Sequence, residues 1–443
     1  MRKPVAPPHM AQLPVAGAFP KMMNHRTLTD HKGRYVHWDK LRHLPLPDDL
    51  ESSEEWWCLI KLARGVAYQA LPLRDKYGQP MNVCLPSELQ ESLHWLDIHA
   101  AGQLVGGQGV ANPHQRNTYL IRSLVDEAIS SSQLEGASTT RNAAKDMIRQ
   151  GRDPRDKSER MILNNYEAMQ FIREVGEEEL TPSIVFELHK LVTKDTLDDN
   201  SAGDLRTADD DIYVVDEIGE VLHTPPDAEQ LASRLQGLCD FANGKRDNGF
   251  LHPVVRAIVL HFMLAYDHPF VDGNGRTARA LFYWAMRKAG YWLMEFISIS
   301  GIIQESKVQY GMAFLHCETD ENDLTYFIVH QMEVIRKAID RLHKYLEERQ
   351  AGLVEAEQML RYSSNLKGKL NFRQLSILRH ALNNPRSIYT IDEHRRSHDI
   401  SYETSRRDLS HMVKLKLLEQ LRQGKTLMFM SPSDLVHRLA DSK

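Results

Sequence analysis

Apolar residues recur every three or four positions along most of the chain, which is the spacing of helices that bury one face. The clearest pair of such helices lies beyond the middle of the chain. One apolar stripe runs over residues 255–266, and a second runs over residues 278–285 and stops before Gly290. The residues between them, 268–279, read HPFVDGNGRTAR. The pattern therefore predicts two core helices joined by a short glycine-rich loop that leads directly into a helix N-terminus.

This loop combines residue types that serve phosphate chemistry. Backbone N–H groups at a helix N-terminus bind anions, and Arg276 and Arg279 add positive charge to the first turns of the second helix. Asn274 is expected to cap that helix. Asp272 is a carboxylate of the kind that holds a hard cation between phosphates. His268 has an ordinary pKa that suits a general base near neutrality. Together these residues favour phosphoryl or nucleotidyl transfer.

A simpler interpretation is a turn between two core helices, with His268 as a buried, hydrogen-bonded histidine. Turn chemistry alone does not require a histidine and two arginines at these offsets. The loop also matches the signature His-x-Phe-x-Asp-Gly-Asn-Gly-Arg-x-x-Arg at every specified position. The chain therefore resembles Fic-domain proteins of the Fido superfamily, over about residues 110–345 and more loosely at the C-terminus.

The resemblance implies a protein adenylyltransferase, which transfers AMP from ATP to a Tyr, Thr or Ser hydroxyl of a target protein (AMPylation). It also implies a role for each residue of the loop. His268 would accept the hydroxyl proton, Asp272 would hold Mg²⁺, and Arg279 would bind the γ-phosphate. The residues implied to bind the α- and β-phosphates are Gly273, Asn274, Gly275 and Arg276. ATP is the implied substrate and Mg²⁺ the implied cofactor.

Residues 118–136 predict a helix that ends at Gly136, a C′ glycine. The end of this helix, Ser131-Ser132-Gln133-Leu134-Glu135-Gly136, resembles the inhibitory Ser-x-x-x-Glu-Gly motif of Fic proteins. The resemblance implies that Glu135 pairs with Arg279 and blocks productive placement of the γ-phosphate. Arginine and carboxylate form a strong bidentate pair. The alternative is an ordinary polar helix end.

Residues 206–226 contain two short β-rich runs around a turn with Gly219. This hairpin resembles the family's flap, which holds the target segment by adding it as a strand; the alternative is a surface hairpin that covers the core. A helix predicted over residues 302–315 carries Tyr310, which corresponds to a family tyrosine near the adenosine. Its ring either stacks on adenine or packs in the core.

The C-terminal residues 366–443 have 15 Lys and Arg against 8 Asp and Glu, a net charge of +7 in a chain of net charge −5. Helices are predicted from Phe372, from the capping box at Thr390 and from Tyr402, and a small hairpin surrounds Gly424. This order resembles a winged helix-turn-helix domain, in which Arg406 and Arg407 would face DNA. Protein docking or dimerisation is the alternative role.

Composition places few further limits on the protein. The chain is 42% hydrophobic and 26% charged, which is typical of a globular protein, and no run approaches the ~18 apolar residues of a membrane span. The four cysteines are scattered without the spacing of a zinc site. We therefore expect a cytoplasmic protein with reduced thiols and no membrane partner.

The predicted fold class is mainly α: a Fic helical core with a β-hairpin flap, followed by a winged helix-turn-helix domain. The predicted parts are an irregular and helical N-terminal region (1–110), a Fic catalytic domain (111–345), a helical linker (346–365) and the winged helix (366–443).

The expected function is protein adenylylation, inhibited by Glu135, with a target protein bound through the flap. A homodimer, and a DNA or protein partner of the winged helix, are further partners that the resemblance leaves open. The alternative from another class is a DNA-binding transcriptional regulator whose Fic domain senses nucleotide. Within enzymes, the alternatives are transfer of UMP, phosphocholine or phosphate, and removal of AMP.

Overall fold

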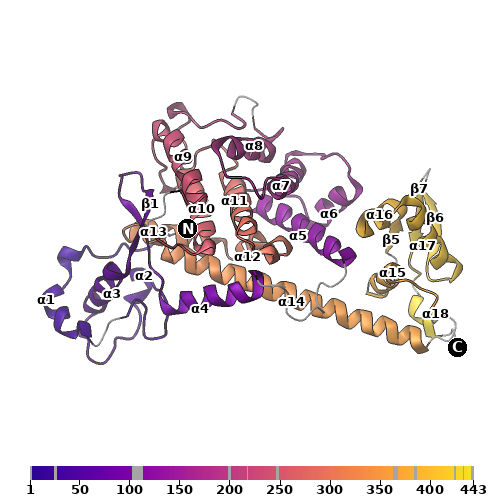
Figure 1. Ribbon diagram of the computed structural model, residues 1–443, viewed down its shortest axis with the longest axis horizontal. Coiled ribbons are helices and arrows are strands. Elements are labelled where there is room, and N and C mark those ends of the chain that lie inside the picture. The colour runs from indigo at the N-terminus through magenta and orange to yellow at the C-terminus, as the bar shows by residue number, and fades with distance from the viewer. Residues whose placement is uncertain are drawn as a thin grey trace. The chain divides into compact units, whose positions relative to one another are not determined.

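A computed structural model describes the protein at residues 2–23, 27–101, 113–197, 201–216, 218–245, 249–362, 368–383, 387–423, 426–432 and 434–440. The regular structure is mostly helical (Figure 1). The chain divides into two compact units. The first comprises residues 1–103, 124–144 and 154–338, and the second comprises residues 104–123, 145–153 and 339–443. No helix among the described residues has both the length and the apolar character needed to cross a bilayer.

Two buried helices, α10 (Pro253–Asp267) and α11 (Asn274–Lys288), form the centre of the first unit (Figure 1). They pack against each other, as the apolar stripes predict, and nearly all of their side chains are buried. α10 begins with Pro253, whose missing N–H suits the first turn of a helix. α11 ends before Gly290, which has a positive φ of 85°.

Other helices surround this pair. α7 (Lys157–Glu174) and α8 (Pro182–Thr193) pack on α11, and α9 (Leu231–Ala242) packs on α10. α5 (Pro113–Leu134) is followed by α6 (Arg141–Gln150).

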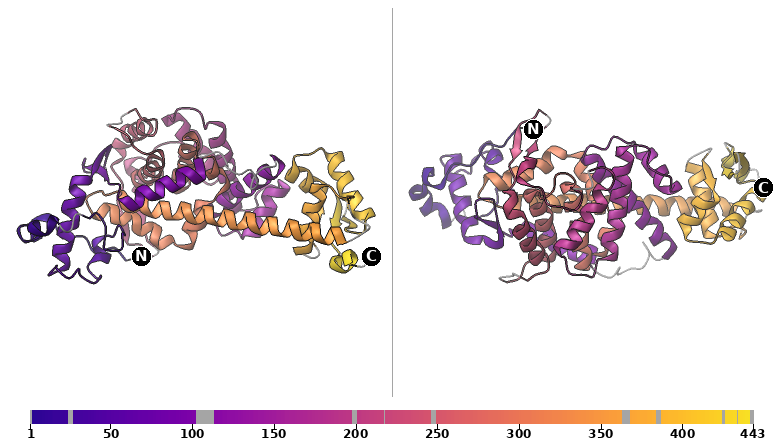
Figure 2. Two further views of the ribbon diagram at one scale, coloured as in Figure 1. Left: turned by 60° about the horizontal axis from the view of Figure 1, so that its bottom comes forward. Right: turned by 90° about the horizontal axis from the view of Figure 1, so that it is seen from above.

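The prediction of one continuous helix over 302–315 is wrong. Two helices are present, α12 (Ile299–Glu305) and α13 (Lys307–Thr319), because the backbone at Ser306 leaves the helical region with φ −146°. α14 (Thr325–Tyr362) is one helix of 38 residues. Its ribbon is unbroken in Figure 2. The predicted linker 346–365 thus falls on the end of α14, except for residues 363–365, which lie outside the described residues.

The N-terminal region contains helices and one hairpin among its described residues. Its helices are α1 (Val15–Ala18), α2 (Trp38–Leu41), α3 (Ser53–Ala67) and α4 (Ser87–Leu96), with short 3-10 turns at Met10–Gln12 and Phe19–Met23. An antiparallel hairpin of β1 (Gln69–Arg74) and β2 (Pro80–Val83) follows α3. This hairpin was not predicted from the sequence.

A buried network of charged and phenolic groups joins the N-terminal region to the rest of the first unit. Lys61 of α3 lies 2.8 Å from Asp320, between Nζ and Oδ1. Tyr326 donates to the other oxygen of Asp320 at 2.7 Å, and Arg64 donates to the Tyr326 hydroxyl at 2.6 Å. We call these four residues the Asp320 cluster. Because all four are buried, α3 is joined to the rest of the first unit by contacts that exclude water.

The predicted hairpin is present as a small antiparallel sheet of β3 (Val214–Val215) and β4 (Val221–His223). We keep the name flap for this hairpin, whose role in target binding remains a prediction. Its turn is closed by the Asp216 carboxylate, which accepts hydrogen bonds from the N–H groups of Ile218 and Glu220. Gly219 has a φ of 84° in this turn, a conformation that favours glycine.

The second unit contains the three predicted C-terminal helices and the predicted hairpin. These are α15 (Phe372–Asn383), α16 (Ile391–His398), α17 (Tyr402–Lys414), β6 (Glu419–Gln423) and β7 (Thr426–Met430). A further strand, β5 (Ile388–Thr390), makes a three-stranded sheet of order β5-β7-β6, and α18 (Leu435–Ala440) follows. Gly424 lies outside the described residues. The assignment as a winged helix remains an interpretation.

Candidate active site

His268 lies at the end of α10 in the left-handed backbone conformation, with φ 45° and ψ 56°. Its Nδ1 atom is 3.1 Å from the carbonyl oxygen of Ala265. A carbonyl oxygen can only accept, so Nδ1 carries the proton and Nε2 keeps its lone pair. Burial lowers the pKa of His268 below its usual 6.5. The imidazole is therefore neutral at neutral pH, with Nε2 able to accept a proton.

Asn274 does not cap α11, contrary to the prediction. The N-cap is Gly273, and Asn274 is the first helical residue. Its side-chain amide instead bonds the backbone of Phe270 twice: Oδ1 accepts from the N–H at 2.9 Å, and Nδ2 donates to the carbonyl at 2.7 Å. Gly273 has φ 82°, and a Cβ atom there would lie 2.8 Å from a methyl carbon of Thr193. The tight turn at Gly273 moves the cap by one residue and leaves Asn274 to brace the loop.

Two residues that support the loop were missed from the sequence. The His189 ring lies flat against Phe270, with the ring centres 3.8 Å apart. Its Nδ1 accepts from Gly203 N–H, and its Nε2 donates to the carbonyl of Asp272 at 2.8 Å. Burial lowers the pKa of His189 to about 4. Arg206 donates from its side chain to the His268 carbonyl at 2.8 Å.

Sequence signals for both residues were weak. A histidine on the apolar face of a predicted helix, as at position 189, most often indicates a buried structural residue. Arg206 follows Gly203 in a segment without periodicity, so its long-range partner could not be inferred.

Arg276 and Arg279 are both buried, but they face different groups. Arg276 donates to the Val192 carbonyl at 2.9 Å and lies 3.4 Å from the Asp272 carboxylate. Arg279 donates from Nε to the Ser131 hydroxyl at 2.9 Å, and from Nη2 to the Glu135 carboxylate at 2.8 Å. The predicted contact between the inhibitory motif and the second arginine of the loop is thus present.

Glu135 also occupies the space above the N-terminus of α11. A Cβ atom added to Gly275 would collide with Glu135 Oε1, and Arg279 Nη1 would lie 3.0 Å from that Cβ. The first N–H groups of a helix have no partner within the helix and attract anions. In this structure the nearby anion is the side chain of Glu135.

The helix that precedes Glu135 is anchored about two turns upstream, at Glu127. Glu127 is buried, and its Oε2 accepts from the Tyr283 hydroxyl at 2.9 Å and from the Ser298 hydroxyl at 2.8 Å. α5 itself ends at Leu134, and Gly136 has the positive φ, 95°, expected of a C′ glycine. Glu135 therefore sits just beyond the rigid part of α5.

Asp272 is the candidate metal ligand. Its carboxylate is partly exposed. It accepts hydrogen bonds from the N–H of Gly273 at 2.6 Å and from Nη2 of Arg276 at 3.4 Å. Among the described residues, no group of three or more His, Cys, Asp or Glu side chains could hold a metal ion. Mg²⁺ is commonly bound through one or two carboxylates together with substrate phosphates. The site therefore fits a Mg²⁺ shared with a bound phosphate, and not an all-protein metal cage.

Tyr310 lies among aromatic side chains next to Arg279. Its hydroxyl is 2.9 Å from His261 Nε2, and its ring meets Phe314 edge-on with centres 5.2 Å apart. Burial raises the pKa of Tyr310 to about 12. The ring is partly buried and packs against these aromatic side chains. Contact with adenine remains a prediction.

The flap is tied to the end of α10. His223 of β4 bonds the carbonyl of Tyr266 through Nε2 at 2.7 Å, two residues before His268. Lys76, in the β1–β2 turn, donates from Nζ to the carbonyl of Thr224, and its backbone N–H donates to the Tyr266 hydroxyl. The flap therefore has a fixed base beside the histidine.

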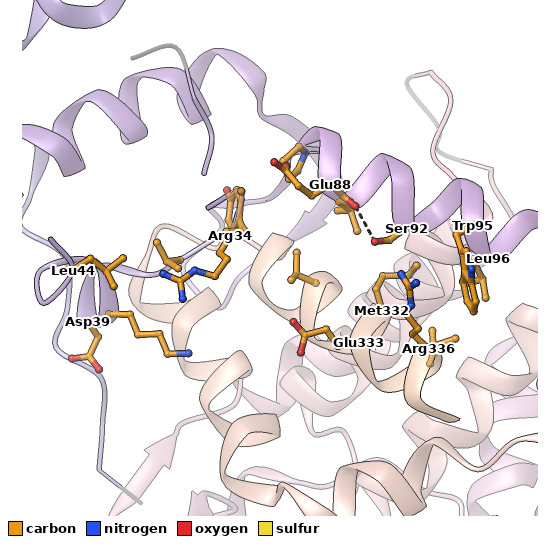
Figure 3. A pocket seen from close by; sticks show the side chains of 18 of the residues that line it. Arg34, Asp39, Leu44, Glu88, Ser92, Trp95, Leu96, Met332, Glu333 and Arg336 are labelled. Carbon is orange, nitrogen blue, oxygen red and sulfur yellow. Dashed lines mark hydrogen bonds between the residues drawn. The ribbon is translucent and has the colours of Figure 1, made fainter. Parts of the chain in front are cut away.

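A separate cavity of about 690 Å³ lies beside α2, α4 and α14 (Figure 3). Apolar side chains such as Leu96 and Met332 line it, with Arg34, Glu333 and Arg336 among its charged groups. None of residues 268–279 is among its lining residues. It is not part of the candidate active site.

Residues 179–286 match the family model of the Fic/DOC family. The Protein adenylyltransferase Fic of Drosophila grimshawi is 35% identical over 132 residues, which are 29% of this chain and 25% of that protein. The protein of the same name from Nematostella vectensis is 42% identical over 69 residues, 16% of each chain. The chain thus matches about a quarter or less of the length of these curated relatives.

Solved structures include a Fic family protein from Desulfovibrio desulfuricans, with a TM-score of 0.49 and 15% identity over 78% of this chain and 94% of that one. Fic-1 from C. elegans has a TM-score of 0.44 and 20% identity, over 58% of this chain and 71% of that one. The family match covers the loop at residues 268–279, and the chain therefore contains a Fic/DOC-family domain.

Proposed function

We propose that this protein is an adenylyltransferase that moves AMP from ATP to a Tyr, Thr or Ser hydroxyl of a target protein. One observation carries the proposal: a single loop joins a neutral histidine with an accepting Nε2 to a helix N-terminus suited to phosphates. The relatives named adenylyltransferase support the reaction class.

The nucleotide phosphates would bind the free N–H groups of Asn274, Gly275 and Arg276 in the first turn of α11. The target hydroxyl would give its proton to Nε2 of His268. Its oxygen would form a bond to the α-phosphorus as the bond from that phosphorus to the bridging oxygen breaks. Pyrophosphate would leave with the electron pair. Most of the rate in such transfers comes from positioning and charge stabilisation.

Asp272 would hold Mg²⁺, since its carboxylate is partly exposed beside the phosphate position. The bound ion would offset the negative charge of the triphosphate. Arg276, buried against Asp272 and Val192, would support the loop from beneath and add positive charge to the site.

Glu135 would inhibit the transfer. Its carboxylate pairs with Arg279 and covers Gly275, so a γ-phosphate would meet both an occupied space and a like charge. Removal of Glu135 would free Arg279 to bind that phosphate. Ser131 would keep Arg279 in position, because its hydroxyl and carbonyl accept from the guanidinium independently of Glu135.

The test uses α-labelled ATP and Mg²⁺ with four full-length proteins: wild type, Glu135→Gly, Glu135→Gly/His268→Ala and the control Glu177→Gly. Glu177 is an exposed glutamate in the turn after α7. We expect label on protein to increase in Glu135→Gly, to vanish without His268, and to match wild type in the control. Retained label without His268 would remove the histidine from its role. Label from γ-labelled ATP alone would mean that phosphate is transferred in place of AMP. Label from UTP alone would mean that UMP is transferred.

A second candidate is a DNA-binding regulator whose Fic domain senses nucleotide. The observation that favours it is α17, capped by Ser401, which exposes both Arg406 and Arg407. Filter binding of DNA by wild type and by Arg406→Ala/Arg407→Ala would test this role. DNA binding that needs these arginines, together with no transfer in any variant, would favour the regulator.

A further inference from the structure

The flap exposes an unusual amount of apolar surface. Tyr213 is 45% exposed, Val215 53%, Ile218 86% and Val221 38%. In the part of the chain that the structure describes, β3 and β4 pair only with each other, so each strand keeps a free edge. Free strand edges beside exposed apolar side chains can pair with a further extended chain.

The segment that carries this sheet is strongly acidic. The described residues between 201 and 230 include one arginine, Arg206, which is buried and bonds the carbonyls of His268 and Pro226. Against it stand eight carboxylates. These are Asp204, Asp209, Asp210, Asp211, Asp216, Glu220, Asp227 and Glu229, and all but Asp216 are exposed.

Two neighbouring lysines do little to neutralise this surface. Lys3 lies 3.6 Å from Glu220, but both side chains are about half exposed, so solvent and salt weaken their attraction. The ammonium group of Lys76 donates to the Thr224 carbonyl. The flap therefore faces solvent as an apolar sheet with a negative border.

We propose that the flap selects extended target segments that carry Lys or Arg beside the acceptor hydroxyl. The inference rests on the proposed transfer and names its substrate class. Strand pairing uses backbone groups that every sequence has, so it cannot select a target. The apolar side chains can take alternate residues of the added strand, and the carboxylates attract cationic residues and repel acidic ones.

The connection of the flap to the histidine makes this selection relevant to the reaction. His223 fixes β4 to the carbonyl of Tyr266, and Arg206 bonds the carbonyl of His268. A strand added to the flap is thereby held in a defined position relative to the base. Binding of basic residues near the hydroxyl then raises the rate of transfer.

The experiment uses three synthetic peptides that share one tyrosine, flanked by Lys and Arg, by Ser and Gln, or by Asp and Glu. Transfer from α-labelled ATP is measured with Glu135→Gly, and binding of the fluorescent peptides is measured with full-length His268→Ala. We expect kcat/KM for the basic peptide to exceed that for the acidic peptide by about tenfold at low salt, with the ratio falling as salt is added.

Two charge-reversal variants make the test specific. Asp209→Lys/Glu220→Lys in the flap should remove or reverse the preference. Glu54→Lys/Glu177→Lys changes the net charge equally at exposed positions outside the flap and should leave the preference intact. An equal shift in both variants would mean a net-charge effect and overturn the inference.

Transfer without a preference for the basic peptide would also overturn it, while the proposed function would stand. Selective binding of the basic peptide with no transfer would instead leave the inference standing and sink the proposed function. Sedimentation could also show a dimer for the wild type and a monomer for the flap variant. A second copy of this chain would then bind the flap, and the inference would be overturned.

Discussion

Two ion pairs in this protein have the same nitrogen–oxygen distance of 2.8 Å but very different surroundings. In the Asp320 cluster, the Lys61 side chain is 5% exposed and that of Asp320 is 1% exposed. At the candidate active site, Arg279 is 2% exposed whereas Glu135 is 31% exposed. Distance alone therefore does not tell a permanent pair from one that can open.

The difference lies in what each charge meets when the pair breaks. Asp320 has a second bond from Tyr326 and cannot reach water without unfolding its surroundings. Glu135 can turn into solvent, and Arg279 would keep both of its bonds to Ser131. The first pair holds α3 to the rest of the first unit, and the second is suited to be released.

The largest effect is expected from Asp320→Asn. Loss of the carboxylate removes the buried partner of Lys61 and a counter-charge 3.8 Å from Arg64, which costs about 3–5 kcal/mol of unfolding free energy. Urea unfolding would measure it. Glu321→Gln is the matched control, because Glu321 lies 3.0 Å from the same lysine but is 60% exposed, so the loss should stay below about 1 kcal/mol. Similar losses of unfolding free energy in both variants would mean that burial of the carboxylate does not set the strength of these ion pairs.

Glu135→Gly should change activity more than stability. Release of a charge-assisted pair is worth about 1.5–3 kcal/mol, so transfer should rise by about tenfold or more. Glu135→Gln keeps the size of the side chain but removes its charge, and should give an intermediate rate. Initial rates with α-labelled ATP would measure both. An unchanged rate in Glu135→Gly would end the case for inhibition.

Gly275→Ala should weaken the Arg279–Glu135 ion pair, because the added methyl group crowds the Glu135 carboxylate. The new methyl group collides with Glu135 Oε1, so the carboxylate has to move, at a cost of about 1 kcal/mol. In the Glu135→Gly background this cost should disappear. A double-mutant cycle on thermal unfolding isolates the coupling and cancels the effect of alanine on the helix itself. Zero coupling would mean that Glu135 does not cover Gly275 in solution.

The smallest effect is expected in the pH dependence of transfer. Burial lowers the pKa of His268, so the neutral base persists to more acidic pH than an ordinary histidine. The rate of Glu135→Gly should be constant through neutrality and fall only as the pH drops through this lowered pKa, below 6.5. A pH–rate profile with its midpoint above 6.5 would contradict the burial of the base.

The same contrast explains what could be predicted from the sequence. The loop at 268–279 could be recognised because phosphate chemistry demands particular residue types at set spacing. The pairing of Arg279 with Glu135 was implied by the resemblance of two short motifs to those of Fic proteins. The contact between Lys61 and Asp320 spans 259 positions, and each residue alone is typical of a surface. No local pattern indicates such a partner.

Local geometry accounts for the remaining differences. The left-handed turn at Gly273 moved the helix cap away from Asn274, although asparagine is among the best capping residues. The break at Ser306 has no proline or glycine to mark it. The strand Gln69–Arg74 includes Pro72 and no β-branched residue, so it did not read as a strand.

The left-handed backbone of His268 has a consequence for how this residue can be replaced. Residues with a side chain are uncommon at positive φ, and Asn, Asp and His are enriched there several-fold. Alanine at position 268 would remove the base and also strain the turn that presents the His268 carbonyl to Arg206. Asparagine would suit the backbone while lacking the imidazole. Histidine thus serves as a turn-forming residue as well as a proton acceptor, and His268→Asn separates these two properties.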